Sequence, residues 1–155
     1  IMLKVIHELP PCIDAVDAKF HVKHIPSILY TYGDSVYTLS DKPIPIWIMK
    51  HEEVHSARQF EYGRMLMEEM GMEPEKDEEN SVGPVEWWKR YIDDSEFRLL
   101  EELVAHQVEW RVFGQLHNRN ERRLYLNSIA ARLSSQMYGD MITLTQAKKL
   151  IKDKE

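Results

Sequence analysis

Cysteine is almost absent from this chain of 155 residues, because Cys12 is the single one. One thiol forms no internal disulfide, which favours a reducing compartment, and we expect a cytoplasmic protein. One thiol also supplies no set of thiolate ligands. Any metal site must therefore be built from histidine and carboxylate side chains.

Long hydrophobic runs and an excess of positive charge are missing too. No apolar run approaches the roughly 18 residues of a membrane span, and the first residues lack the basic-then-apolar pattern of a secretion signal. The formal net charge of −6 disfavours nucleic acid and anionic membranes as partners. We expect neither partner, and the oligomeric state stays open. The length and the 43% hydrophobic content are typical of a single domain, residues 1–155.

The first half of the chain predicts two helices around a small sheet. Residues 10–21 predict a helix, and residues 27–32 and 35–39 predict an antiparallel hairpin. Residues 46–70 predict a long helix that ends at Gly71. The acidic segment 72–84, with its glycine and proline, predicts a mobile loop.

The second half predicts helices throughout. Residues 85–93 look helical, and Asp94 or Ser95 is expected to cap a helix that runs to about Phe113. Residues 119–134 predict another helix, and Thr145 is the expected cap of the last one. The fold class is therefore α+β, mostly helical, with a small antiparallel sheet or hairpin before the long helix.

The long helix carries a His-Glu-x-x-His motif within KHEEVHSARQ. His51 and His55 lie one turn apart on one face, so both imidazoles can bind one ion. Zinc accepts such ligands and acidifies a bound water, and Glu52 is placed to take the proton of that water. The motif is short, and two half-exposed histidines on a wet helix fit it equally well.

The position of the motif on its helix favours a real site. The histidines share a stripe with Tyr62, Met65 and Leu66, so we expect them to point toward the core. A third ligand is needed, and EELVAHQVE at residues 101–109 offers two glutamates. Glu101 lies on an apolar arc of its helix, which mildly favours it, since a buried carboxylate needs a partner. Glu102 shares a stripe with His106 and Glu109, and both glutamates remain candidates.

The stretches HEEVHSARQ and FRLLEELVAHQVEWR together resemble the gluzincin-type zinc metallopeptidases. The likeness is greatest to small metallopeptidases encoded mostly by phages, and it covers about residues 25–150. The flanking stretches YTYGDSVYTLSDKPIPIWIMK and IAARLSSQMYGDMIT look similar to theirs as well. The resemblance implies a zincin-like domain that cleaves peptide or protein substrates, in the host cytoplasm if a phage encodes it.

The resemblance also selects among the site residues. It assigns the third zinc ligand to Glu102, three residues before Ala105, and leaves Glu101 as the alternative. Where better-known gluzincins have an aspartate that supports a zinc ligand, this chain has His106. In zincins an edge strand pairs with the extended substrate, and residues 35–39 are the candidate for that strand.

Further polar residues are candidates for supporting roles. Tyr138 and His106 are candidates for donating to a developing oxyanion or for holding a ligand. For Tyr138 we favour an ordinary turn residue. Arg58 and Glu109 lie on the metal-facing stripes of their helices, and we expect them to pair.

Three functions follow in order of preference. The first is a zinc hydrolase, a metallopeptidase with zinc on His51, His55 and Glu102 and with Glu52 as the base. The second is a non-catalytic structural zinc site in a phage-related assembly or host-interaction protein. The third is a helical scaffold that binds no metal.

Overall fold

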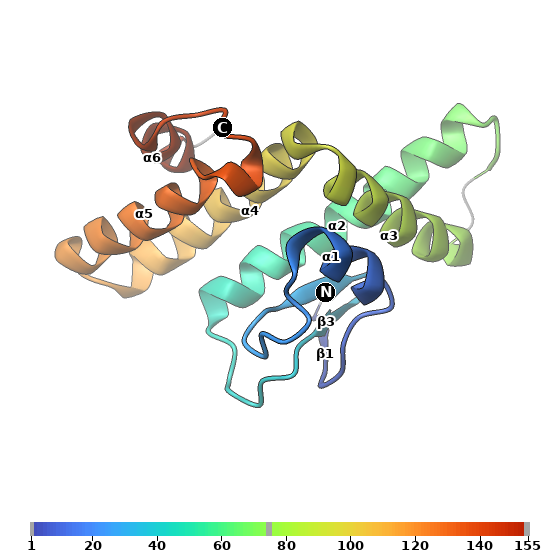
Figure 1. Cartoon of the computed structure of the whole chain (residues 1–155), viewed down its shortest axis with the longest axis horizontal. Helices are drawn as coiled ribbons and strands as arrows, with labels where there is room; N and C mark the ends of the chain where they lie inside the picture. Colours follow the sequence, from blue (N-terminus) through green and yellow to red (C-terminus); the bar gives the residue numbers. More distant parts are fainter. Residues whose placement is uncertain (1, 74–75, 154–155) are drawn as a thin grey trace. The chain divides into compact units, whose positions relative to one another are not determined.

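The computed structural model describes residues 2–73 and 76–153, and for residues 76–81 only the backbone. It forms two compact units (Figure 1). The first comprises Ile1–Pro43 and His55–Asp93, and the second comprises Ile44–Val54 and Asp94–Glu155. The division falls inside one long helix, which contributes a segment to each unit. The expected α+β class is confirmed, with helices dominating one small sheet.

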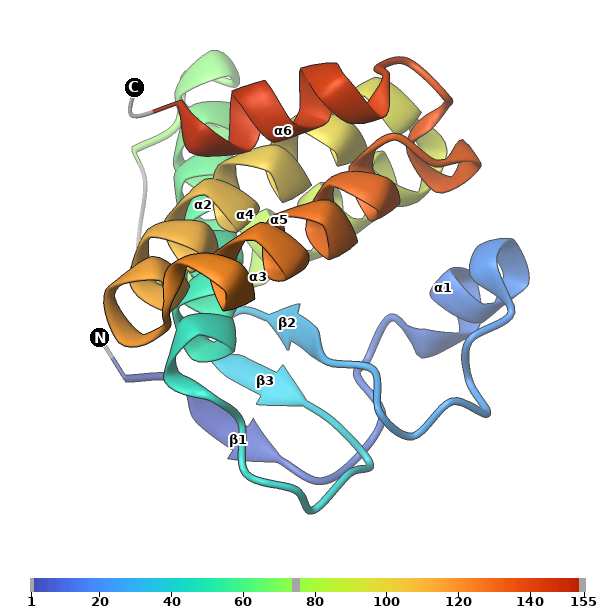
Figure 2. The same cartoon turned by 90° about the vertical axis from the view of Figure 1, so that its left-hand side faces the viewer.

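The sheet belongs to the first unit and has the strand order β1-β3-β2 (Figure 2). β2 (Tyr30–Tyr32) and β3 (Ser35–Tyr37) form the expected antiparallel hairpin, and Gly33 turns the chain with a φ of 64°. The strand β1 (Lys4–Ile6) was not expected and pairs with β3 in parallel. β3 is therefore the central strand, and the prediction that residues 35–39 offer a free edge to substrate is wrong.

Helices α1 and α2 end where left-handed residues stop them. α1 (Ile13–Phe20) ends at His21, which has a φ of 56°. α2 (Ile46–Glu69) ends at Gly71, which has a φ of 72°. The Gly71 N–H donates to Glu68 O at 3.0 Å, and the Met72 N–H donates to Met67 O at 2.9 Å. This pair of bonds is a Schellman motif, and it confirms Gly71 as the stop of the helix.

The loop predicted at 72–84 is largely wrong, because α3 (Lys76–Asp93) begins inside it. Residues 74–75 lie outside the described part of the chain. Gly83 and Pro84 suggested a loop, but tertiary packing uses both inside a helix. A Cβ at Gly83 would lie 2.1 Å from the backbone oxygen of Gln59, so only glycine permits this approach to α2. Pro84 is fully buried and lies against Gly33.

Polar side chains of α2 and α3 hold the hairpin in the first unit. Gln59 is fully buried; its Oε1 accepts from the Gly33 N–H and its Nε2 donates to Thr31 O, both at 2.8 Å. Ser56 Oγ donates to Gly33 O at 2.7 Å, and Trp88 Nε1 donates to Thr31 O at 2.9 Å. These bonds satisfy buried backbone groups at the turn, which would otherwise cost stability. They fix the middle of α2 against the hairpin.

The second unit is built from helices α4 (Ser95–Leu116), α5 (Arg119–Leu133) and α6 (Leu144–Lys152), which lie side by side in Figures 1 and 2. A short 3-10 helix, η1 (Gln136–Tyr138), joins the last two. Their buried cluster consists of Leu126, Ile129, Ala130, Leu133, Tyr138, Ala147 and Ile151.

Helices α4 and α6 of the second unit begin at the side chains that cap them. Asp94 caps α4 by accepting from the N–H groups of Glu96 and Phe97, as expected. The cap of α6 is Thr143 and not the expected Thr145. Thr143 and Gln146 form a reciprocal capping box, which satisfies two backbone N–H groups at once. These two reciprocal hydrogen bonds explain why Thr143, and not Thr145, caps the helix.

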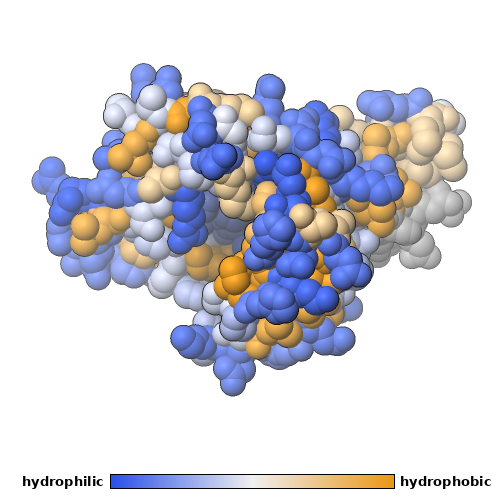
Figure 3. All heavy atoms as spheres, in the orientation of Figure 1, coloured by the Kyte–Doolittle hydropathy of each residue, from blue (hydrophilic) through white to orange (hydrophobic). Residues whose placement is uncertain are grey.

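The exposed surface mixes polar and apolar side chains. On the face in Figure 3, hydrophilic residues surround and interrupt the hydrophobic ones. Among the described residues, no helix is both long enough and apolar enough to span a membrane. A mixed surface of this kind is ordinary, because single exposed apolar residues occur on most proteins.

Candidate metal centre

The helix α2 presents the three motif residues to the interior, as the stripe predicts for the two histidines. His51, Glu52 and His55 are all buried, although Met65 on the same predicted stripe is exposed. Each of the three offers a ligand atom, and these atoms lie within 4.8 Å of one another. The histidines are one helical turn apart, so this grouping follows from α2 alone.

Glu102 of α4 faces the Nε2 atom of His51. Its Oε1 lies 3.1 Å from that nitrogen, and Glu52 Oε2 lies 3.8 Å from it. Ligand atoms about 2.0–2.1 Å from a tetrahedral zinc lie roughly 3.3 Å from one another. The spacing of His51 Nε2 and Glu102 Oε1 is that of a hydrogen bond, and it is also close to the spacing of two ligands of one ion. Glu52 Oε2 stands farther from this nitrogen than Glu102 Oε1 does.

The two candidate glutamates differ in where they lie on α4. Glu101 is 2% exposed and Glu102 is 9% exposed, so burial does not separate them. Successive helix residues point about 100° apart, so the two carboxylates leave α4 in different directions. The carboxylate of Glu102 reaches His51 Nε2 within the second unit, at 3.1 Å.

Acidic side chains make the surroundings of His51 strongly favourable to positive charge. Burial lowers the pKa of His51, but nearby carboxylates outweigh burial and hold this pKa well above its ordinary value. These carboxylates belong to Glu52, Glu102 and Glu109. An opposite charge at this distance stabilises the charged form of a group. The same field that favours a proton favours a metal cation.

The other nitrogen of His51 is held by a residue to which sequence reasoning assigned no such role. His51 Nδ1 lies 2.7 Å from Glu109 Oε1, and His106 Nδ1 lies 2.9 Å from the same oxygen. The only sequence signal was the stripe of α4 that Glu102, His106 and Glu109 share. Arg58 was the expected partner of Glu109, and that pairing stays a prediction.

His51, His106 and Glu109 also group closely enough to suggest a second metal site. Their separations argue against one. Distances of 2.7 and 2.9 Å are those of N–H···O hydrogen bonds, whereas two ligands of one zinc stand farther apart. We therefore assign this group to support of His51, with His106 as part of it.

The remaining candidates lie in packed surroundings. His55 lies beside the ring of Trp87, with centroids 5.4 Å apart in the first unit. Tyr138 is buried in the apolar cluster of the second unit, among side chains of α5 and α6. The sequence favoured an ordinary turn residue, and the structure adds that this tyrosine packs in the core. An oxyanion role stays a prediction.

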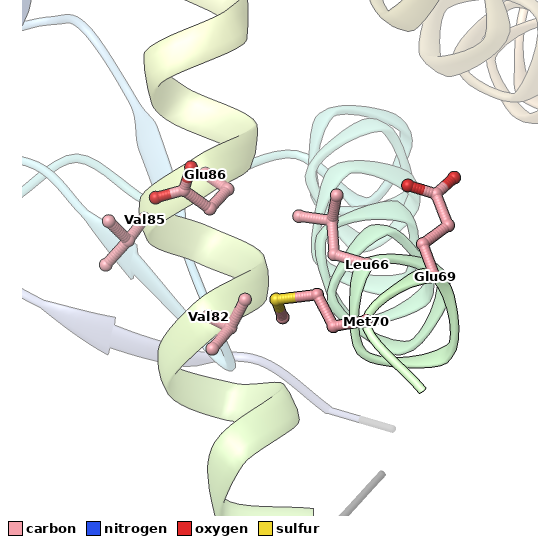
Figure 4. A pocket seen from close by; sticks show the side chains of 6 residues that line it. All are labelled: Leu66, Glu69, Met70, Val82, Val85 and Glu86. Atoms are coloured by element: carbon pink, nitrogen blue, oxygen red, sulfur yellow. The ribbon is translucent and has the colours of Figure 1, made fainter. Parts of the chain in front are cut away.

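A separate hollow lies in the first unit between the end of α2 and α3 (Figure 4). Met70 and Val82 point toward one another across it. Its lining offers apolar side chains and two carboxylates but no histidine, so it does not resemble the centre around His51. The lining residues are Leu66, Glu69, Met70, Val82, Val85 and Glu86.

No protein-family model, curated protein or solved structure matches this chain. The resemblance to gluzincin-type peptidases therefore stays a prediction.

Proposed function

We propose that this chain is a zinc-dependent peptidase with zinc on His51, His55 and Glu102. One observation carries the proposal. His51 has its Nδ1 hydrogen-bonded to Glu109 and its Nε2 directed at Glu102 and Glu52. A histidine that is oriented by a carboxylate behind it and faces a second carboxylate in front is typical of metal ligands. The donor set of nitrogen and oxygen atoms suits zinc.

Zinc at these ligands would supply Lewis-acid chemistry, which polarises a peptide carbonyl and acidifies water. Glu52 is the base in the proposed reaction. It accepts a proton from the attacking water as the new C–O bond forms at the carbonyl carbon. It then returns the proton to the amine nitrogen as the C–N bond breaks, so no other reactant is needed.

The test compares Glu52→Gln with Glu53→Gln, its neighbour on α2. Glu53 pairs with Lys50 at 3.2 Å and has no assigned part in the reaction. Zinc-loaded wild-type protein and both variants are incubated with a peptide library, and cleavage is followed by mass spectrometry. General-base catalysis contributes about 10²–10⁴-fold, so Glu52→Gln should lose at least a hundredfold while it retains zinc. Equal cleavage by Glu52→Gln and Glu53→Gln would exclude Glu52 as the base.

A non-catalytic zinc site, in a phage-related assembly or host-interaction protein, is the second candidate. The observation in its favour is burial, because His51, Glu52, His55 and Glu102 are each at most 9% exposed. A structural zinc has four protein ligands, and its removal unfolds the domain. Circular dichroism with a chelator separates the two functions. A peptidase should keep its helical signal when zinc is removed, and a structural site should lose it.

A further inference from the structure

Glu109 is a buried carboxylate that accepts hydrogen bonds from three side chains, one each from α2, α4 and α5. It is 1% exposed. His51 Nδ1 from α2 and His106 Nδ1 from α4 donate to its Oε1, at 2.7 and 2.9 Å. The hydroxyl of Tyr125, from α5, donates to its Oε2. A buried charge persists only when it is paired in this way.

The hydrogen-bond roles in this group follow from its geometry. Two ring nitrogens and one hydroxyl lie at hydrogen-bond distance from the two oxygens of Glu109. A carboxylate only accepts, so both Nδ1 atoms carry a hydrogen. The Nε2 atom of His51 is then the one directed at Glu102, 3.1 Å away.

We propose that Glu109 is a positioning residue for metal binding, and that Tyr125 holds Glu109 in place for this task. Glu109 fixes the tautomer and the ring orientation of His51, so that Nε2 is presented to the ion. This inference rests on the proposed zinc function. It adds a support that the sequence motif does not contain, because the carboxylate lies seven residues after Glu102 on α4.

Tyr125 is itself held by an aromatic stack. Its ring lies parallel to that of Phe113, with centroids 3.9 Å apart, and Phe113 stacks on His117 at 3.7 Å. Trp47, near the start of α2, meets the ring of Phe113 edge-on at 5.3 Å. Aromatic contacts of this kind restrict ring rotation and add to stability. The packed ring therefore holds the Tyr125 hydroxyl in a fixed position beside Glu109.

His106 completes the group. Its Nδ1 lies 2.9 Å from Glu109 Oε1 and donates to that oxygen. Its ring lies 4.6 Å from that of His51. A lysine or arginine at this place would repel a metal beside His51 through its permanent charge, whereas histidine supports Glu109 through a ring N–H.

The experiment measures zinc affinity in Glu109→Gln and Tyr125→Phe, with Glu96→Gln as the control. Glu96 is an exposed glutamate in the first turn of the same helix. The zinc dissociation constant is obtained by competition with a chromogenic chelator at one pH. Loss of such a supporting contact weakens metal binding by about 10–100-fold, which is the change expected for Glu109→Gln. Tyr125→Phe should weaken binding by at least threefold, and Glu96→Gln should leave it unchanged.

A second readout separates positioning from mere structural support. In ¹⁵N spectra of the histidine rings, zinc-loaded wild type should show His51 with a protonated Nδ1 in one tautomer. In Glu109→Gln this Nδ1–H signal should move or broaden. If Glu109→Gln does not fold, Tyr125→Phe decides, because it removes a single hydroxyl from a ring whose packing is retained.

The outcomes distinguish this inference from the function on which it rests. If wild type binds no zinc, the proposed function fails and the inference fails with it. If wild type binds zinc and both Glu109→Gln and Tyr125→Phe bind it within twofold of wild type, the function stands and the inference is overturned.

Discussion

His51 Nδ1 lies 2.7 Å from Glu109 Oε1, while the opposite ring nitrogen lies 3.1 Å from Glu102 Oε1. One imidazole thus lies between two glutamates that are two helical turns apart on α4. The arrangement leaves a single direction in which His51 can offer a lone pair. Glu109 thereby orients a histidine of the short sequence motif so that its Nε2 faces the proposed metal.

Zinc should stabilise the folded protein through His55 as well as through His51. Binding to the folded state alone contributes about 2.7 kcal/mol when free zinc is a hundredfold above its dissociation constant. We expect the melting temperature to rise on addition of zinc and to fall back with a chelator. His55→Ala should abolish the rise, and His7→Ala, at an exposed histidine, should retain it. A rise of equal size in His55→Ala would remove His55 from the ligand set.

Gln59→Ala should destabilise the protein by about 1–3 kcal/mol, because it leaves the buried Gly33 N–H without its acceptor. Urea denaturation measures the free energy of unfolding. Gln115→Ala, at an exposed position of α4, serves as the control and should change this free energy by no more than about 0.5 kcal/mol. Equal stability of the two variants would show that the Gln59 amide does not hold the hairpin.

Gly83→Ala should destabilise the protein by about 3 kcal/mol or prevent its folding, since the new Cβ would meet the Gln59 backbone oxygen at 2.1 Å. Gly114→Ala is the matched control within α4. A Cβ there meets the flexible side chain of Arg122 at 3.2 Å, and alanine is the better helix former. Thermal unfolding of both variants checks the prediction. A stable Gly83→Ala protein would contradict the close approach of α2 and α3.

Cys12 should react slowly with alkylating reagents in the folded protein. Burial raises the pKa of its thiol to about 12. The thiolate is the reactive form, so at pH 8 an ordinary cysteine holds several hundredfold or more thiolate than Cys12. Labelling with iodoacetamide, followed by mass spectrometry, should be slow until denaturant is added. Because the pKa is raised, the native rate should climb tenfold per pH unit up to about pH 10. Rapid labelling of native protein at pH 8 would contradict this.

The sequence predicted those parts of the fold that local signals control. Gly71 ends α2 and Asp94 caps α4 because their conformation and hydrogen bonding act within a few residues. A signal of equal locality contradicts the cap predicted at Thr145. Thr143 and Gln146 have the spacing of a capping box, and Thr143 is the cap.

Other features depend on contacts between distant residues, which no local pattern reveals. β1 is three residues long and is defined by its parallel pairing with β3. Gly83 suggests a loop in the sequence, and only the approach of α2 shows why a glycine is there. In each case tertiary packing overrides local propensity.

The residues of the candidate site also divide into those that a local pattern predicts and those that depend on packing between helices. The motif predicted His51, Glu52 and His55, because helical spacing places them together. Glu102 came from resemblance, whereas periodicity favoured Glu101. Glu109 shares the stripe of Glu102, but its contact with His51 depends on how α2 packs against α4. Register between two helices is a tertiary property.

The central claim is that this chain binds one zinc ion through a set that includes Glu102. Elemental mass spectrometry of protein purified without a chelator or a histidine tag tests it most directly. Glu102→Ala is compared with Glu101→Ala, since both remove a buried carboxylate from the same turn. We predict about one zinc per chain in wild type and in Glu101→Ala, and none in Glu102→Ala. Wild-type protein without zinc, even after reconstitution, would contradict the claim and leave KHEEVHSARQ as part of a packed helix.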